Sequence, residues 1–221
     1  MFARHGAKVV LADVQDELGL SVCKDIIRSY QNQGKLDVML ANAGIAGHND
    51  TWISANDYVD FKRMFDINVY GAFLAAKHAA KVMIPANKGS ILFTSSIASV
   101  IHGLVSHTYS ASKHAIVGLT KNLGVELGQY GIRVNCIPPF GVATSLLREG
   151  MGGIDVETTE ELFYAAANLK EAVLKGEDVA EAALYLASDE SKKVSGLNLV
   201  VDGGYSTINV AFEMSPKRFL P

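Results

Sequence analysis

Cysteine and long apolar runs are scarce in this chain of 221 residues, and each scarcity excludes a class of protein. The two cysteines, Cys23 and Cys136, are too few for a disulfide framework or a cysteine-based zinc site, so we expect no bound metal. No apolar run approaches the roughly 18 residues that a membrane span needs, and no apolar stretch typical of a signal peptide follows the first basic residues. These absences predict a soluble, cytoplasmic protein without a membrane partner.

Charge of either sign is also low. Lysine and arginine number 20, against 23 aspartate and glutamate residues, and the formal net charge is −3. Proteins that bind nucleic acids usually carry a basic surplus that neutralises phosphates, so we expect no nucleic-acid partner. The chain is instead rich in hydrophobic residues, at 49%, and in glycine, with 20 residues. This composition predicts a single folded domain over residues 1–221 with a large buried core.

Short apolar runs alternate with helical stretches along the chain. The expected strands are residues 8–13, 36–42, 90–94, 132–137 and 197–201. The expected helices are residues 15–29, 56–84, 109–129, 160–174 and 178–187. Continuous apolar strands separated by helices predict βαβ units, and so an α/β fold with a doubly wound parallel sheet. Such sheets bind ligands beyond the carboxyl ends of their strands, where we therefore look for functional residues.

Small and polar residues follow several of the expected strands. They are Asp13, Asn42, Ala43, Gly44, Ser95, Val142 and Thr144. Taken singly, each is open to a simpler interpretation as a turn or helix-capping residue, and for Thr144 capping is the favoured one. Taken together on one edge of a sheet, they predict a binding site.

Tyr109 and Lys113 form the strongest local signal, because residues four apart lie on the same face of a helix. A lysine ammonium beside a phenol favours the phenolate, so we expect a lowered pKa for Tyr109 and a role as proton donor or acceptor. Ser95 could hold the reacting oxygen, and Asn68 is a poor helix former whose side chain would mark a local distortion. The alternatives are a surface Tyr/Lys pair and a solvated helix residue.

Together these residues resemble the pattern of a known family. In chain order they are Asn42-Ala43-Gly44, Asn68, Ser95, Tyr109-x-x-x-Lys113, Pro139-x-x-Val142-x-Thr144 and Asp202-Gly203-Gly204. The pattern covers nearly the whole chain and is similar to the classical short-chain dehydrogenases/reductases, in particular the plant branch that contains secoisolariciresinol dehydrogenase. The resemblance implies a Rossmann-like domain with a seven-stranded parallel sheet. It also implies an oxidoreductase that converts a secondary alcohol or lactol of a hydrophobic lignan or terpenoid to the carbonyl.

The resemblance also assigns roles to residues. As catalytic residues it implies Asn68, Ser95, Tyr109 and Lys113. As residues that bind the cofactor NAD it implies Asp13, Asn42, Ala43, Gly44, Tyr109, Lys113, Val142 and Thr144, with Asp13 on the adenosine ribose. An aspartate at that position repels a 2′-phosphate, so NAD is expected rather than NADP.

Two further expectations concern the partners of the chain. The loop at residues 140–162 carries leucine, methionine and isoleucine side chains that would either shape an apolar substrate pocket or only pack the loop onto the domain. Small residues on the helices at 56–84 and 109–129 suit a close helix pairing across a two-fold axis, and the family implies a homodimer or homotetramer. In the alternative interpretation, these small residues pack only against the chain's own sheet.

The sequence departs from the family pattern in the half that binds the dinucleotide. We find no TGxxxGIG-type glycine turn, and residues 29–35 are too few for the strand and helix that the family has there. The expected sheet therefore lacks its first strand and one further strand. This leaves an alternative function open, that of a shortened, non-catalytic subunit with impaired cofactor binding.

Overall fold

A parallel sheet lies at the centre of the molecule. The computed structural model describes residues 1–9, 35–47, 51–170 and 172–207. The strands in these residues are β1 (Val38–Ala41), β2 (Gly89–Thr94) and β3 (Ile132–Ile137). They lie in the order β1-β2-β3, and both pairs are parallel, with Val38 opposite Ser90 and Gly89 opposite Ile132. The predicted α/β class with a parallel sheet is confirmed.

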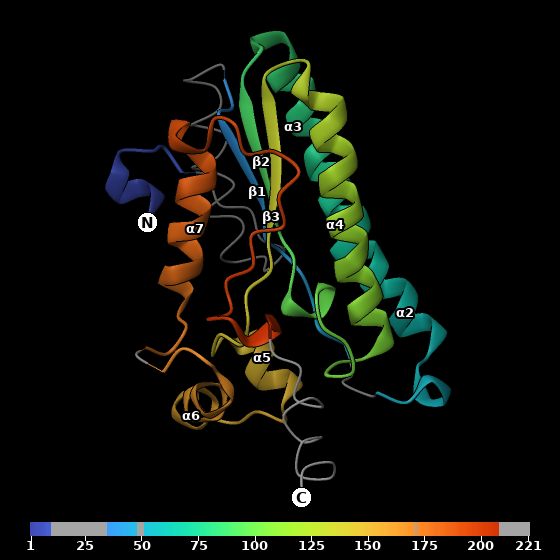
Figure 1. Ribbon diagram of the computed structural model, residues 1–221. Helices are drawn as coiled ribbons and strands as arrows, with labels where there is room; N and C mark the ends of the chain where they lie inside the picture. Colours follow the sequence, from blue (N-terminus) through green and yellow to red (C-terminus); the bar gives the residue numbers. More distant parts are fainter. Residues whose placement is uncertain (10–34, 48–50, 171, 208–221) are drawn as a thin grey trace, which may run out of the picture.

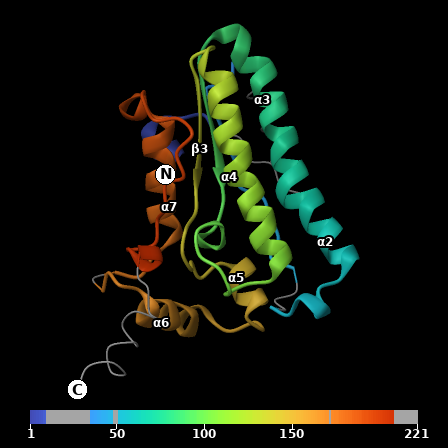
Figure 2. The same cartoon turned by 45° about the vertical axis from the view of Figure 1, so that its right-hand side comes forward.

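Helices cover both faces of this sheet (Figure 1). The α-helices are α2 (Tyr58–Phe65), α3 (Ala72–Ala86), α4 (His107–Gly128), α5 (Ser145–Gly150), α6 (Val156–Ala166) and α7 (Gly176–Ala187). α3 and α4 lie on one face and α7 on the other, whereas α5 and α6 lie beyond the carboxyl ends of the strands (Figures 1 and 2). In the described part of the chain, no helix is long and apolar enough to cross a membrane.

The middle strand shows why the apolar runs predicted the sheet. Ile91 and Phe93 of β2 point into the core formed with α3 and α4, which includes Ile116, whereas Leu92 points the other way and packs near Leu186 of α7. Each of these five side chains is at most 1% exposed. A strand covered by helices on both faces buries every side chain, so its sequence is continuously apolar instead of alternating.

The expected helix at residues 56–84 is divided into three parts. Asp57 caps its start by accepting a hydrogen bond from the Asp60 backbone N–H, and α2 then runs into a π-helical turn, Asp66–Gly71, before α3 continues to Ala86. Asn68 lies inside the π-helical turn, so the predicted local distortion at this residue is confirmed. A π-helical turn inserts one extra residue and is frequent at functional sites.

Two other expected elements differ from the structure. Residues 197–201 form no regular strand but follow β3 through isolated parallel bridges at Cys136–Asn198 and Pro139–Val201, because the two prolines after β3 supply no backbone donors. The helix expected at 160–174 is α6, which ends at Ala166. There the Lys170 ammonium donates to the carbonyls of the last turn and ends the helix.

The strand expected at residues 8–13 and the helix expected at residues 15–29 lie almost entirely outside the described residues. Lys8 and Val9 are described and are not part of a strand. Residues 10–13, the helix expected at 15–29 and Cys23 are not among the described residues.

Candidate functional site

The segments after β1 and β2 meet α4 at one point. A Cβ added to Gly44 would lie 3.1 Å from the Asn68 Oδ1 and 3.6 Å from the Lys113 Nζ, so a larger residue would require Asn68 to shift by a few tenths of an ångström. Lys113 Nζ donates to the carbonyl oxygen of Thr94 at 3.1 Å, and the Thr94 hydroxyl donates to the Asn42 Oδ1 at 2.7 Å. The structure thus brings together four of the residues predicted for the site: Asn42, Gly44, Asn68 and Lys113.

Asn68 is held rigidly in place although its helix is distorted. Its Oδ1 accepts from the Ile45 backbone N–H at 2.8 Å, and its Nδ2 donates to the Ile45 carbonyl oxygen at 2.9 Å. The side chain is buried, at 3% exposed. The simpler interpretation of a solvated helix residue is therefore wrong, and Asn68 joins the π-helical turn to the loop after β1.

Tyr109 and Lys113 project from the first turns of α4. Ser106 begins this helix by accepting a hydrogen bond from the Tyr109 backbone N–H at 3.3 Å. The Lys113 Nζ lies 5.5 Å from the centroid of the Tyr109 ring, and the Ser96 side chain lies near enough to the phenol to act on its pKa. Tyr109 is half-buried and Lys113 only 5% exposed, so the pair is no solvated surface pair.

The two serines after β2 occupy different environments. The Ser95 Oγ is buried, within hydrogen-bond distance of the Ser99 Oγ (3.0 Å) and the Lys113 carbonyl oxygen (3.1 Å). Ser96 has extended backbone, so its side chain points away from that of Ser95, is partly exposed and reaches Tyr109. Sequence reasoning placed both serines after this strand but assigned the substrate oxygen to Ser95. The available signal was the Ser-Ser pair itself, since adjacent residues of an extended segment face opposite sides.

Burial controls the protonation of the pair. It raises the pKa of Tyr109, and the nearby Ser96 side chain opposes this only in part. Burial also lowers the pKa of Lys113 to about 8. The expected lowering of the Tyr109 pKa is therefore wrong for the protein without ligand, because loss of hydration of the phenolate outweighs the effect of a lysine that is itself poorly hydrated.

Lys113 retains hydrogen-bonding capacity for a ligand. An ammonium has three donors, and among the described residues only the Thr94 carbonyl oxygen accepts from it. Two donors are thus available beside the Tyr109 phenol, and hydroxyl groups of a sugar suit them. The donor set fits the ribose of a dinucleotide cofactor.

The remaining predicted cofactor residues make local contacts or lie outside the described part. Thr144 is exposed and caps α5, accepting from the Leu147 backbone N–H at 3.4 Å, as the capping interpretation predicted. Val142 is half-buried, and its carbonyl oxygen accepts a hydrogen bond from the Thr144 backbone N–H. Ala43 is exposed. Asp13 lies outside the described residues.

α5 and α6 carry exposed apolar side chains near the carboxyl ends of the strands. Leu146 is 38% exposed, Met151 36% and Leu162 50%. The Nε of Arg148, also on α5, is buried and has no hydrogen-bond partner. An exposed apolar surface at this place suits a hydrophobic ligand.

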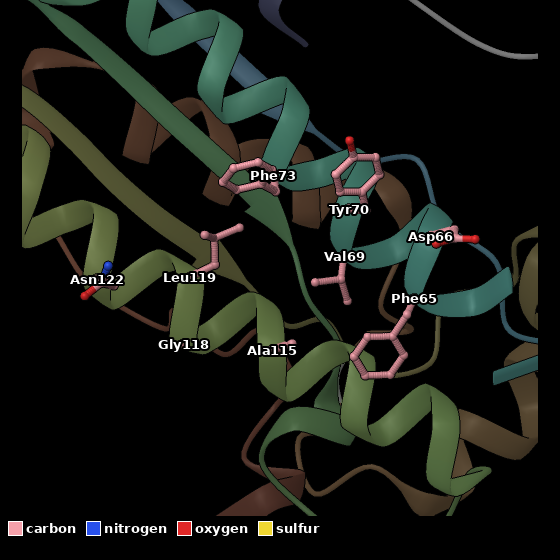
Figure 3. A pocket seen from close by; sticks show the side chains of 9 residues that line it. All are labelled: Phe65, Asp66, Val69, Tyr70, Phe73, Ala115, Gly118, Leu119 and Asn122. Carbon is pink, nitrogen blue, oxygen red and sulfur yellow. The ribbon is translucent and has the colours of Figure 1, made fainter. Parts of the chain in front are cut away.

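A groove lies between α4 and the α2–α3 helical segment. Its volume is about 540 Å³, and Figure 3 shows that residues of both helical segments line it. Its lining residues are Phe65, Asp66, Val69, Tyr70, Phe73, Ala115, Gly118, Leu119 and Asn122. In contrast, Ala72, Ala76 and Ala79 of α3 are buried against the sheet. The small residues are thus divided between the core and the groove.

No cluster of three or more histidine, cysteine, aspartate or glutamate side chains that could hold a metal ion occurs in residues 1–9, 35–47, 51–170 and 172–207. The charged groups of the site are those of α4 described above. Near the Tyr109 phenol lie the hydroxyl of Ser96 and the amine of Lys113.

Comparison with known sequences identifies close relatives. A family model described as enoyl-(acyl carrier protein) reductase matches residues 1–206. The chain is 52% identical to a short chain aldehyde dehydrogenase 1 of Euphorbia lathyris, over 96% of this chain and 84% of the relative. It is 49% identical to the secoisolariciresinol dehydrogenase of Forsythia intermedia, over 95% of this chain and 83% of the relative. The Euphorbia alignment spans 241 positions, more than the 221 residues of the chain, so the relative has internal residues that this chain lacks.

A solved structure shares the fold. The structure of ElxO with NADP bound superposes with a TM-score of 0.73 and 30% sequence identity, over 89% of this chain and 77% of that chain. Such similarity confirms the Rossmann-like architecture that the sequence predicted.

Proposed function

Because the chain belongs to the family of short-chain dehydrogenases/reductases, we propose that it is a nicotinamide-dependent dehydrogenase that oxidises a secondary alcohol or lactol to the carbonyl compound. The observation that carries the proposal is the Tyr109 phenol with the Ser96 side chain beside it and the Lys113 Nζ 5.5 Å from the centroid of its ring. These groups provide an acid–base hydroxyl, a second hydroxyl for the substrate oxygen and a cation beside the phenol.

The residues of the site divide the chemistry among them. A bound nicotinamide supplies the acceptor of the hydride. The Ser96 hydroxyl holds the substrate oxygen, and the Tyr109 oxygen takes the proton from the alcohol hydroxyl. Lys113 stabilises the phenolate form of Tyr109 and binds the ribose hydroxyls. Asn68 anchors a water molecule that relays the proton away from the site.

The protonation states of Tyr109 and Lys113 in the free protein determine which proton transfer is possible. Because burial raises the pKa of Tyr109, its phenol keeps its proton at neutral pH and is ready to donate to a carbonyl oxygen. Oxidation of an alcohol needs the phenolate, which the Lys113 ammonium favours below its own pKa of about 8. Tyr109 must therefore lose its proton before it can take the proton of the alcohol.

NAD is the proposed cofactor, bound by Asp13, by the segment Asn42 to Gly44, and by Val142 and Thr144. The acidic side chain of Asp13 supports NAD, since it would repel the 2′-phosphate of NADP. ElxO binds NADP, so the family alone does not decide between the two. The decisive comparison is the rate with each cofactor at equal concentration.

The proposed substrate is a hydrophobic lignan or terpenoid alcohol. The name of the Forsythia relative, secoisolariciresinol dehydrogenase, supports this class. The exposed apolar side chains of α5 and α6 support it independently, because they would lose contact with water when they cover a ring-bearing substrate.

A second copy of this chain is the proposed protein partner. The groove between α4 and the α2–α3 segment is lined mainly by aromatic and aliphatic side chains, with Ala115 and Gly118 allowing close approach. A two-fold pairing of this surface closes into a dimer, and a second contact of the same kind would give a tetramer.

One observation favours an alternative function. The internal residues that this chain lacks relative to the Euphorbia protein are consistent with a non-catalytic subunit in which cofactor binding is impaired. Titration calorimetry with NAD and NADP separates the two functions, because the alternative predicts no binding of either.

The first prediction concerns Tyr109→Phe. We expect a fall in turnover by on the order of 10²–10⁴, the usual contribution of a general acid–base group. The assay follows the absorbance of reduced nicotinamide with a panel of terpenoid and lignan alcohols. Tyr185→Phe, at an exposed position of α7, is the matched control and should keep wild-type turnover. Equal turnover of the Tyr109 variant and the wild type would contradict the assignment.

A further inference from the structure

We propose that Ser112 is a positioning residue, which fixes the amide of Asn68 and thereby holds the loop at Ile45 against the Tyr109–Lys113 pair. Its Oγ lies 3.2 Å from the Asn68 Nδ2 and 2.8 Å from the Tyr109 carbonyl oxygen. Ser112 is fully buried, at 0% exposed. Its effect on turnover rests on the proposed function, whereas its effect on the loop does not.

The hydrogen-bond directions leave one orientation for the amide. The Tyr109 carbonyl oxygen can only accept, so the Ser112 hydroxyl donates its single hydrogen to it. The Ser112 Oγ must therefore accept the hydrogen bond from Asn68. The group of Asn68 that faces Ser112 is therefore the NH₂. At the other end the Ile45 backbone N–H can only donate, so it must face the Asn68 Oδ1. Both ends of the amide are thus determined.

This chain of bonds links three segments of the site. It starts at the loop after β1, passes through the π-helical turn and ends on the backbone of Tyr109 in α4. The space around it is tight, since a Cβ at Gly44 would lie 3.1 Å from Asn68 and 3.6 Å from Lys113. Movement of the Asn68 amide therefore changes the position of the loop relative to the catalytic pair.

Removal of the hydroxyl leaves this amide with only its two hydrogen bonds to Ile45. In Ser112→Ala, one Nδ2 hydrogen of Asn68 loses its acceptor in a buried place, and the amide can rotate to seek another. The Ile45 N–H, which bonds to the same amide, is then protected less well. In Ser112→Thr the hydroxyl remains, so the link should persist.

α4 provides a matched control. Thr120 lies two turns beyond Ser112, is 1% exposed and donates to the Ile116 carbonyl oxygen at 2.8 Å, but it contacts none of the site residues named above. Thr120→Val removes a buried hydroxyl of the same helix without touching Asn68. Both hydroxyl deletions should lower the melting temperature, and only the one at Ser112 should affect the site.

The experiment measures hydrogen exchange of the Ile45 amide by NMR, together with kcat and KM, in full-length protein. In Ser112→Ala we expect Ile45 to exchange about five to ten times faster, the factor for roughly one lost hydrogen bond. We expect kcat to fall by roughly tenfold to a hundredfold, as for a slight misplacement of catalytic groups, with KM changed by less than about twofold. Ser112→Thr and Thr120→Val should match the wild type in both measurements.

The exchange measurement and the kinetic measurement together distinguish a failure of this proposal from a failure of the proposed function. Unchanged exchange at Ile45 in Ser112→Ala would overturn the proposal, as would a normal kcat together with a loss of melting temperature equal to that of Thr120→Val. If the wild type turns over no alcohol with either cofactor, the proposed function fails. The exchange arm then decides alone whether Ser112 positions the loop.

Discussion

At the scale of single residues, Lys113 lies in the candidate site, and the burial of its ammonium lowers the stability of the folded protein. Its pKa is about 8 in the folded protein and 10.5 in the unfolded reference, so the unfolded chain binds more protons between these values. Stability therefore rises with pH across this window and is lowest below it. A difference of this size corresponds to on the order of 3 kcal/mol at neutral pH.

The second prediction follows for Lys113→Met. The variant replaces a poorly hydrated ammonium by an apolar side chain, so we expect it to be more stable than the wild type at pH 7 by on the order of 1–3 kcal/mol, with the bond to Thr94 as an opposing loss. The advantage should shrink as the pH rises from 8 to 10. Urea unfolding at several pH values measures it, and a constant difference would contradict the assigned cause.

The choice between Ser95 and Ser96 shows what the sequence leaves undetermined at this scale. Strand patterning located the end of β2 correctly, and both serines directly follow it. Which of the two faces Tyr109 depends on the backbone direction beyond the strand, and this is fixed by contacts distant in sequence, such as the Ser95 N–H to Ile137 carbonyl bond. Asn68 was easier to interpret, because an asparagine within an apolar helix already indicated a distortion.

At the scale of elements, burial explains which segments were predictable. β3 agrees with the expectation at both ends, residues 132–137, and β2 differs by one residue, because strands covered on both faces are continuously apolar. The end of α6 was not predictable. Asn168 and Leu169 bond to the turn at Gly203 and Gly204, and this tertiary contact draws the chain away from the helix.

The third prediction concerns α5, where Arg148 has a buried Nε without a partner. An unpaired buried donor costs about 1–3 kcal/mol, so Arg148→Met, which keeps an apolar stem, should raise the melting temperature by about 2–4 °C. Arg133→Met is the contrasting variant. Its guanidinium donates to the carbonyls of Leu186 and Ser188, so that variant should melt lower. A lower melting temperature for Arg148→Met in thermal unfolding would contradict this explanation.

At the scale of the whole molecule, the small residues of the long helices serve two purposes. Those of α3, such as Ala76, pack against the chain's own sheet, and Gly124 of α4 lies against Gly196. Gly118, in contrast, lies on the groove of Figure 3, where an added Cβ would meet nothing within 4 Å. The alternative of internal packing therefore holds for some of these residues and not for Gly118, which remains available to a second copy.

The fourth prediction uses this difference. In Gly118→Arg the new side chain has space in the monomer but fills the groove, so we expect the dimer or tetramer to dissociate while the monomer stays folded. Gly128→Arg is the matched control, since Gly128 is also on α4, exposed and without neighbours for an added Cβ, but outside the groove. Replacing glycine in a helix contributes about 0.8–1 kcal/mol in both variants, so any difference between them reports on assembly. Light scattering coupled to size exclusion measures the mass. A wild-type monomer would contradict the proposed second copy, and equal assembly of the two variants would place the partner surface elsewhere.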